Sequence, residues 1–99
     1  MSTPASERVV RFRALHERGI FVIANAWDAG SARVLAGLGF PAIATSSGAM
    51  AHTLGRVDGR VSREEAFAHA HALVEAVDLP VAADLEKGFG DGPGDAAET

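Results

Sequence analysis

The amino-acid sequence predicts an α/β fold built on a parallel β-sheet. Short apolar runs alternate with segments of helical periodicity, and each run is followed by polar or glycine residues. A strand, a helix of about ten residues and another strand form a βαβ unit, whose crossover is right-handed in nearly all proteins. With 99 residues, of which 47% are hydrophobic, the chain has the size of one small domain with a modest core.

The first half of the chain predicts a helix, a strand, a second helix and a second strand. Residues 5–17 place apolar side chains among charges at helical spacing, so we expect a covering helix there. Residues 20–24 are a continuous apolar run, typical of a strand buried on both faces. Asp28 is placed to cap a helix over residues 29–38, and residues 41–45 predict the second buried strand.

The second half begins with an expected loop and then repeats the helix and the strand. Residues 46–60 contain several glycines and few residues suited to a core, which indicates a long connection. Ser62 and Glu65 are spaced as a capping box that opens a clearly periodic helix. Residues 81–84 predict the third buried strand, and the last nine residues predict a loop and the first turn of a further helix.

Composition excludes several classes of function. The formal charge of −4 argues against general nucleic-acid binding, which usually shows as a basic patch. The absence of cysteine excludes disulfides, thiolate metal sites and a cysteine nucleophile within these residues, and fits a reducing cytoplasm. No apolar run has the length of a signal peptide or a membrane span. We therefore expect a cytoplasmic protein with neither a nucleic acid nor a membrane as its partner.

Two acids mark the end of the third predicted strand. Because side chains alternate along a strand, Asp84 and Glu86 are expected on one face, with Cα atoms roughly 6.5 to 7 Å apart. Mg²⁺ prefers such oxygen ligands and is typically held by one or two carboxylates together with the substrate. The alternative is that the two acids are solvated residues at the start of a loop.

Other polar and aromatic residues follow the first two predicted strands. Thr45, Ser46 and Ser47 form a small-residue turn whose amides and hydroxyls suit an anionic group, although a purely structural turn would look the same. Asp58 is a further candidate acid or an ordinary turn residue. Trp27 is expected either to wall a pocket or to plug one end of the core.

Taken together, four segments resemble the isocitrate lyase and phosphoenolpyruvate mutase superfamily. The match covers residues 16–99 and rests on NAWDAGSAR at 25–33, FPAIATSSG at 40–48, LGRVD at 54–58 and DLEKGFG at 84–90. The resemblance implies a (β/α)8 TIM barrel, of which this chain supplies an N-terminal helix and the first β-α-β-α-β units. Residues 1–99 would then be the incomplete N-terminal part of a single barrel domain.

The resemblance also implies a function and a set of site residues. The expected activity is that of a Mg²⁺- or Mn²⁺-dependent lyase or mutase, which breaks or forms a C–C or P–C bond of a small 2-oxo or 2-hydroxy acid through a metal-stabilised enolate. The expected assembly is a homo-oligomer, usually a tetramer. The residues that match the superfamily's site are Asp84 and Glu86 for the metal, Asp58 as a catalytic acid near it, and Trp27, Thr45, Ser46 and Ser47 for the substrate.

The sequence departs from the superfamily pattern at the third strand. Glu86, Lys87 and Phe89 stand where the superfamily commonly has a second aspartate, a small residue and a tyrosine. The cysteine-containing loop of the superfamily's lyases does not occur before Thr99, so the choice among lyase, mutase, hydrolase and decarboxylase stays open. The alternative hypothesis is a non-catalytic truncated chain that serves as a metal- or carboxylate-binding module or as an assembly module.

Overall fold

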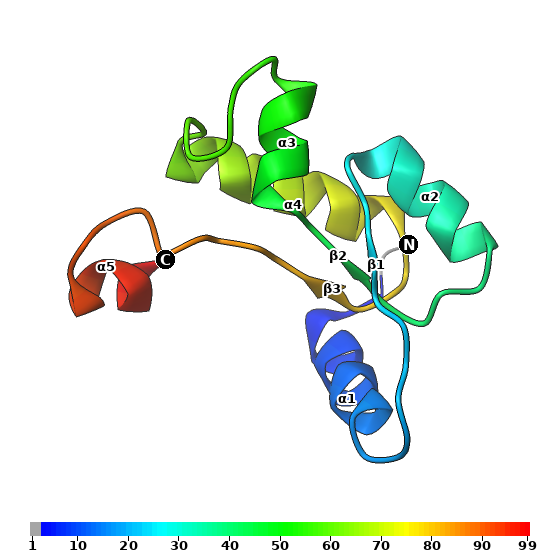
Figure 1. Ribbon diagram of the computed structural model, residues 1–99. Coiled ribbons are helices and arrows are strands. Elements are labelled where there is room, and N and C mark those ends of the chain that lie inside the picture. The colour runs from blue at the N-terminus through cyan, green and yellow to red at the C-terminus, as the bar shows by residue number, and fades with distance from the viewer. Residues whose placement is uncertain (1–2) are drawn as a thin grey trace.

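The computed structural model describes residues 3–99 and has three short strands among five helices (Figure 1). The elements follow in the order α1 (Ala5–Leu15), β1 (Ala24–Asn25), α2 (Ala29–Gly37), β2 (Ile43–Ala44), α3 (Ser47–Thr53), α4 (Arg63–Ala76), β3 (Val81–Ala82) and α5 (Pro93–Glu98). The strands form one parallel sheet in the order β1-β2-β3, which confirms the predicted α/β class and parallel pairing.

Two apolar clusters hold these elements together. The first joins the sheet to α2 and α4, and its buried members are Ala26, Ala32, Ile43, Leu73 and Val77. The second joins α3 to the start of α4, and its buried members are Met50, Ala51, Val61 and Ala66. Leu85 and Phe89, which follow β3, pack against the second cluster, so the chain beyond the third strand is held close to α3.

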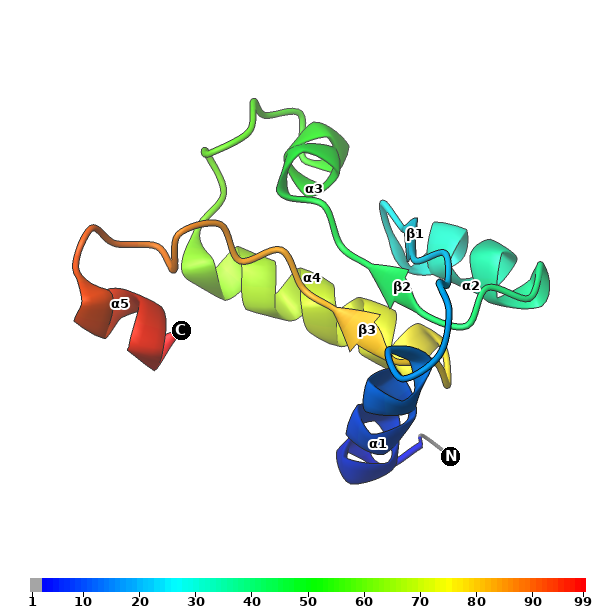
Figure 2. The same ribbon diagram turned by 60° about the horizontal axis from the view of Figure 1, so that its bottom comes forward.

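Helix α1 lies at the amino end of the strands, next to the start of β3 (Figure 2). Two arginines bond it to the connection that follows α4: Arg11, whose Nη1 donates to the Asp78 carbonyl oxygen at 2.8 Å, and Arg8, which is only 7% exposed. The guanidinium of Arg8 donates to the carbonyl oxygens of Val77 and Leu79, each at 2.8 Å, and of Thr3 at 3.1 Å. The first two carbonyls belong to the connection between α4 and β3, so Arg8 fastens α1 to that connection.

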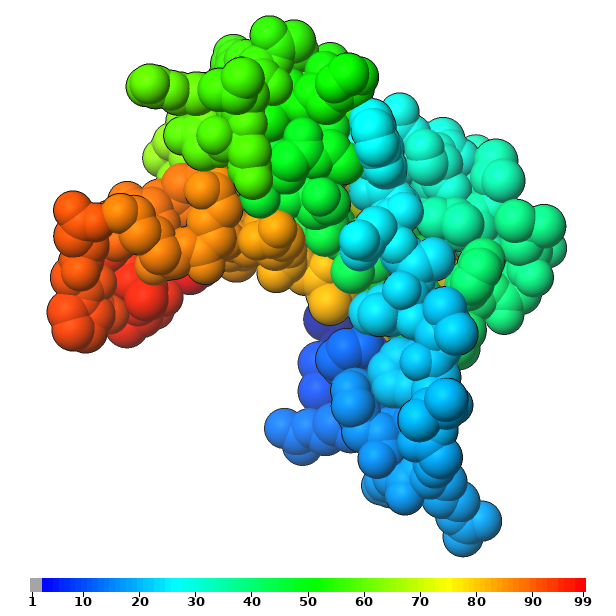
Figure 3. Space-filling model, in the orientation of Figure 1, coloured from blue at the N-terminus to red at the C-terminus, as the bar shows by residue number. Residues whose placement is uncertain are grey.

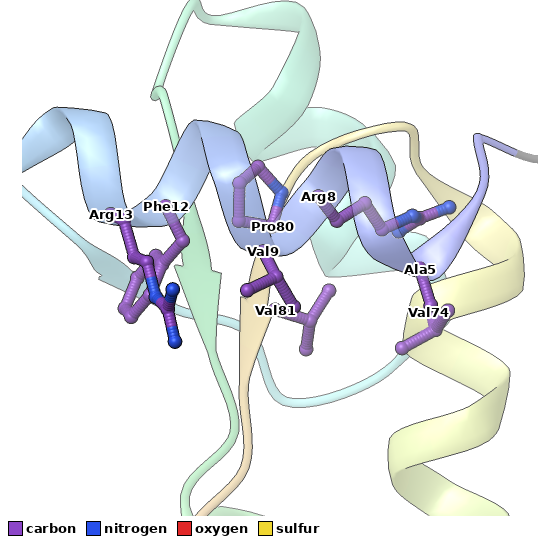
Figure 4. Close-up of a pocket in the computed structure, with 8 residues that line it drawn as sticks. All are labelled: Ala5, Arg8, Val9, Phe12, Arg13, Val74, Pro80 and Val81. Carbon is purple, nitrogen blue, oxygen red and sulfur yellow. The ribbon is translucent and has the colours of Figure 1, made fainter.

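An apolar hollow remains between α1, α4 and β3, with a volume of about 310 Å³ (Figure 4). Val9 lines it and is still 52% exposed, while Val10 is 67% exposed. The predicted covering helix is therefore present, two residues shorter than expected, but its apolar side is only partly covered. In the space-filling view, the α1 end and the α5 end project from the body and leave an open bay between them (Figure 3).

The prediction for the first strand was wrong over most of its length. Only Ala24 and Asn25 pair in β1, while Ile20 is 99% exposed and Val22 is 63% exposed. The physical reason is that β2 begins at Ile43, opposite Ala24, so residues 20–23 have no strand to pair with on that side, and among residues 3–99 no strand pairs with the other edge of β1. Phe21 alone finds aromatic neighbours here, with its ring edge-on to that of His16 at 5.0 Å between centroids.

The expected loop over residues 46–60 was also wrong in part, because it contains helix α3. The Ser46 hydroxyl accepts a hydrogen bond from the amide of Ala49 at 3.2 Å and thereby caps this helix. Met50 and Ala51 are buried in the second cluster. A seven-residue helix spans only about two turns, too few for its apolar residues to show a period.

The two helix caps expected from sequence are confirmed, although the last helix, α5, begins at Pro93, within the segment expected to be a loop. Asp28 caps α2 by accepting from the amide of Ser31 at 2.8 Å. Ser62 and Glu65 form the predicted capping box at the start of α4. Hydrogen bonds to Glu65 from Arg56 and from the Ser62 amide lower the pKa of its carboxyl to about 2. None of the helices in the described part of the chain combines the length and the apolar character that a membrane span requires.

Candidate active site at the carboxyl edge of the sheet

The carboxyl ends of the three strands bring the predicted site residues to one edge of the sheet. The register pairs Asn25 with Ala44 and Ala44 with Ala82, so the segments that leave β1, β2 and β3 start side by side. Trp27 lies in the first of these segments and Asp84 in the third. In parallel α/β sheets, ligands bind at this edge.

The Asp84 side chain is fixed in the third segment by backbone amides. Its Oδ2 accepts from the amide of Ser47 at 3.0 Å, and its Oδ1 accepts from the amide of Glu86 at 3.1 Å. Its own amide donates to the hydroxyl of Thr45 at 2.7 Å. The hydrogen bond from the Ser47 amide, followed by that from the Glu86 amide, lowers the pKa of the Asp84 carboxyl below its usual range. Asp84 therefore presents an ionised, exposed and fixed carboxylate.

The predicted sharing of one strand face by Asp84 and Glu86 was wrong. Strand β3 ends at Ala82, and residues 85–88 form a turn in which Glu86 has a φ of +53°. Within this turn it is the Glu86 amide that meets Asp84, while the Glu86 side chain is exposed. Among residues 3–99, no group of three or more histidine, cysteine, aspartate or glutamate side chains could hold a metal ion.

Close packing explains the glycine that ends this turn. A Cβ atom on Gly88 would lie 2.5 Å from Cα of Ala96 in α5, and its φ of +93° also favours glycine. Phe89, in contrast, is anchored on the second apolar cluster. The ammonium of Lys87 forms an ion pair with Asp91, four residues further along the same loop. The end of the segment DLEKGFG is thus shaped by the packing of Gly88 against α5 and of Phe89 against the second apolar cluster.

Thr45, Ser46 and Ser47 form the start of α3 rather than an open loop. Thr45 is buried and its hydroxyl accepts from the Asp84 amide, while the Ser46 hydroxyl caps the helix. Ser47 is buried and directs its amide to Asp84. These contacts hold the site together, and the predicted role of the three residues in binding a substrate carboxylate stays a prediction.

Asp58 lies beside the same first turn of α3. A Cβ atom on Gly48 would lie 3.6 Å from Oδ2 of Asp58, so the backbone at Gly48 and this carboxylate are neighbours. Asp84 contacts the preceding residue, Ser47. The structure therefore brings Asp58 and Asp84 to the same helical turn, although they are separated by 26 positions in the sequence.

Trp27 does not plug the core, because 47% of it is exposed. Its indole packs edge-on against the ring of His52 in α3, with 5.3 Å between centroids. Its carbonyl oxygen lies 2.8 Å from Nε2 of His69 in α4. Sequence reasoning missed both histidines as neighbours of Trp27, because neither lies near it in the chain and their spacing forms no recognised motif.

The residues that surround Asp84 fit a divalent cation held together with a substrate. A carboxylate can accept about four hydrogen bonds or ligand contacts, and the amides of Ser47 and Glu86 leave acceptor capacity on both oxygens of Asp84. Magnesium commonly uses one or two carboxylates and completes its shell with water and substrate oxygens. Asp84 offers one such carboxylate, and the predicted metal role of Glu86 stays a prediction, because its amide is the group that meets Asp84.

Comparisons with known proteins identify the family to which these features belong. The family model of phosphoenolpyruvate phosphomutase matches residues 12–99. The chain is 39% identical over 92 residues to 2,3-dimethylmalate lyase of Eubacterium barkeri, an alignment that covers 91% of this chain and 30% of that enzyme. It is also 39% identical over 84 residues to an uncharacterized protein of Mycobacterium tuberculosis, covering 83% of this chain and 32% of that protein.

Solved structures agree with the sequence relatives. A protein of Burkholderia cenocepacia J2315, provisionally described as a lyase/mutase, superposes with a TM-score of 0.91 at 50% identity, over 93% of this chain and 34% of that protein. A crystal structure of 2,3-dimethylmalate lyase, a member of the PEP mutase/isocitrate lyase superfamily, superposes with a TM-score of 0.76 at 30% identity, over 91% of this chain and 32% of that enzyme. The chain spans about a third of the length of these relatives.

Proposed function

This chain belongs to the phosphoenolpyruvate phosphomutase family, and we propose from that premise that it forms the N-terminal part of a (β/α)8 barrel enzyme. The three parallel strands would be the first three of the barrel, and residues 1–99 would belong to a single domain. The relatives with a described activity are a lyase and proteins described as lyase/mutase or phosphonomutase. In barrels of this kind the active site lies at the carboxyl edge of the strands.

The proposed reaction is the cleavage or formation of a C–C or P–C bond in a small 2-oxo or 2-hydroxy carboxylic acid. When bound, a Mg²⁺ or Mn²⁺ ion supplies positive charge beside the enolate oxygen that such a reaction develops. Asp84 and Glu86 would hold that ion. The lyase relative named for 2,3-dimethylmalate supports a small branched or unbranched dicarboxylic acid as the class of substrate to test first.

The observation that carries this proposal is the state of the Asp84 carboxylate. It is ionised, exposed and fixed by two backbone amides, and it keeps acceptor capacity for a ligand. A carboxylate that is already oriented needs little rearrangement when a charged ligand arrives, which is the condition for electrostatic stabilisation of a transition state. Asp58 lies beside the same helical turn and would act as an acid or base toward the bound substrate.

The remaining candidate residues would act on the substrate from the first two segments. We assign to Ser46 and Ser47 the contact with the substrate carboxylate and to Trp27 one wall of the site. Thr45 would contribute mainly by holding the Asp84 segment, because its hydroxyl already accepts from the Asp84 amide. We also propose a homotetramer, by analogy with the superfamily.

The test is the substitution Asp84→Asn in the complete enzyme. Turnover of 2,3-dimethylmalate or phosphoenolpyruvate, assayed across a Mg²⁺ titration, should fall by about 10²- to 10³-fold, the loss typical of removing one group that stabilises developing charge. The matched control is Asp91→Asn, which removes an exposed carboxylate from the same loop. Turnover that is unchanged in Asp84→Asn, or that is equally lost in Asp91→Asn, would remove Asp84 from the proposed site.

A further inference from the structure

The connection between β1 and α2 holds Trp27 in an unusual setting for a tryptophan. Trp27 lies between the last residue of β1, Asn25, and the helix cap Asp28, and nearly half of it is exposed. A half-exposed aromatic ring in a short connection is free to adopt several rotamers unless neighbouring groups restrict it. Two histidines from two other helices supply that restriction.

The first is His69 of α4, which bonds to the backbone of Trp27. Its Nε2 lies 2.8 Å from the Trp27 carbonyl oxygen. A carbonyl oxygen only accepts hydrogen bonds, so Nε2 must be the ring nitrogen that carries the hydrogen. This bond joins the β1–α2 connection to α4 across 42 positions of sequence, and it fixes the backbone from which the indole projects.

The second is His52 of α3, which touches the indole itself. The two rings meet edge to face, at 76° between their planes, an arrangement that aromatic rings favour. Helices α3 and α4 also pack against each other, so both histidines sit on one body. The backbone of Trp27 is therefore fastened to α4 while its ring rests on α3.

We propose that His69 is a positioning residue that sets where the Trp27 indole lies at the carboxyl edge of the sheet. Without its Nε2–H, the β1–α2 connection would lose its bond to α4, and the indole would leave its place against His52. The effect on catalysis rests on the proposed function, in which Trp27 forms one wall of the substrate site. The effect on the position of the indole does not depend on that function.

The experiment follows the fluorescence of Trp27, the one tryptophan among the 99 residues. Acrylamide quenching is measured for the complete protein and for His69→Leu and His69→Gln, with Trp27→Phe as the blank that isolates the Trp27 signal. His69→Leu should increase the quenching of Trp27. His69→Gln, which places an amide N–H near the position of Nε2, should restore the quenching of the original protein. His71→Leu, an exposed histidine on the same helix, is the matched control and should change nothing.

Enzyme kinetics on the same variants supply the second measurement. His69→Leu should raise KM by roughly three- to tenfold, the factor expected from one hydrogen bond, with kcat little changed. Asp84→Asn should lower turnover by about 10²- to 10³-fold and leave the Trp27 quenching as it is. A protein with no turnover of any tested acid would defeat the proposed function, yet the quenching series would still decide the role of His69.

Two results would overturn the inference. One is a His69→Leu variant, folded by circular dichroism, whose Trp27 quenching equals that of the original protein. The other is a His69→Gln variant as strongly altered as His69→Leu, because the hydrogen bond would then not be the feature that matters. If His69→Leu does not fold, the Gln variant alone decides: original quenching supports the inference, and increased quenching contradicts it.

Discussion

The two ends of the sheet each hold a charged side chain bonded to the backbone, but in opposite states. At the amino end, Arg8 is 7% exposed and its guanidinium donates to three carbonyl oxygens. At the carboxyl end, Asp84 is exposed and its carboxylate accepts from two amides. Both charged groups are fixed, but only the Asp84 carboxylate faces solvent and can still accept contacts from a ligand.

The difference separates a charge that serves the fold from one that is available to a ligand. A buried charge is tolerated only when the protein satisfies it, and a satisfied buried charge has little left to offer another molecule. An exposed carboxylate retains its attraction for cations while its amide partners keep it oriented. Substitutions at Arg8, Thr45 and Asp84 test this difference.

Replacing Arg8 by methionine breaks the amino end. The carbonyl oxygens of Val77 and Leu79 would lose their donors, so the free energy of unfolding should fall by about 2 to 4 kcal/mol. Urea unfolding followed by circular dichroism measures the loss. Arg8→Lys should recover part of it, and Arg18→Met, which removes an exposed arginine, is the control. A loss below that of the control would mean that Arg8 does not hold α1 in place.

Replacing Thr45 by valine tests the hydrogen bond that holds the backbone of Asp84. Valine has nearly the shape of threonine but cannot accept from the Asp84 amide, so unfolding should become easier by about 1 kcal/mol. Thr45→Ser keeps the hydroxyl and should retain the hydrogen bond, so it is the matched comparison in the same urea experiment. Equal stability of the Val and Ser variants would show that the hydroxyl contributes nothing to the position of Asp84.

Replacing Asp84 by asparagine tests the pH dependence of the carboxyl end. Because the folded state lowers the pKa of Asp84, the ionised carboxylate adds stability above the unfolded pKa, near 3.8, and this contribution is lost as the pH falls through the folded pKa. Asp84→Asn should therefore be less stable than the original chain above about pH 5, and the difference should shrink below pH 4. Thermal unfolding across pH 2.5 to 7 measures it. A difference that does not vary with pH would contradict the ionised state assigned here.

Much of the fold was predictable because it follows local rules. Asp28 and the Ser62–Glu65 pair carry short-range capping signals, and these helix starts are where the sequence indicated. The parallel sheet followed from alternation of apolar runs and helices. The wrong predictions concerned which segments lie side by side. Residues 20–23 were predicted as a buried strand because their apolar content does not reveal whether a neighbouring strand exists.

The candidate site was predictable in its residues but not in its geometry. Asp84 was selected from its place after an apolar run, and it does lie at the carboxyl edge. Its relation to Glu86 depended on how far β3 extends, which is decided by pairing with β2 and by the turn at residues 85–88. The bond between His69 and Trp27 joins residues far apart in the chain, and a single sequence carries no signal for such a contact.

The hydrogen bonds of Arg8 determine which positions tolerate substitution. Its acceptors are main-chain carbonyls, which every amino acid supplies, so the bonds do not depend on which side chains occupy positions 77 and 79. A saturation library should accept at those positions any residue that packs well, while position 8 accepts arginine almost alone. The interaction therefore restricts the amino acid at position 8 and does not restrict those at positions 77 and 79.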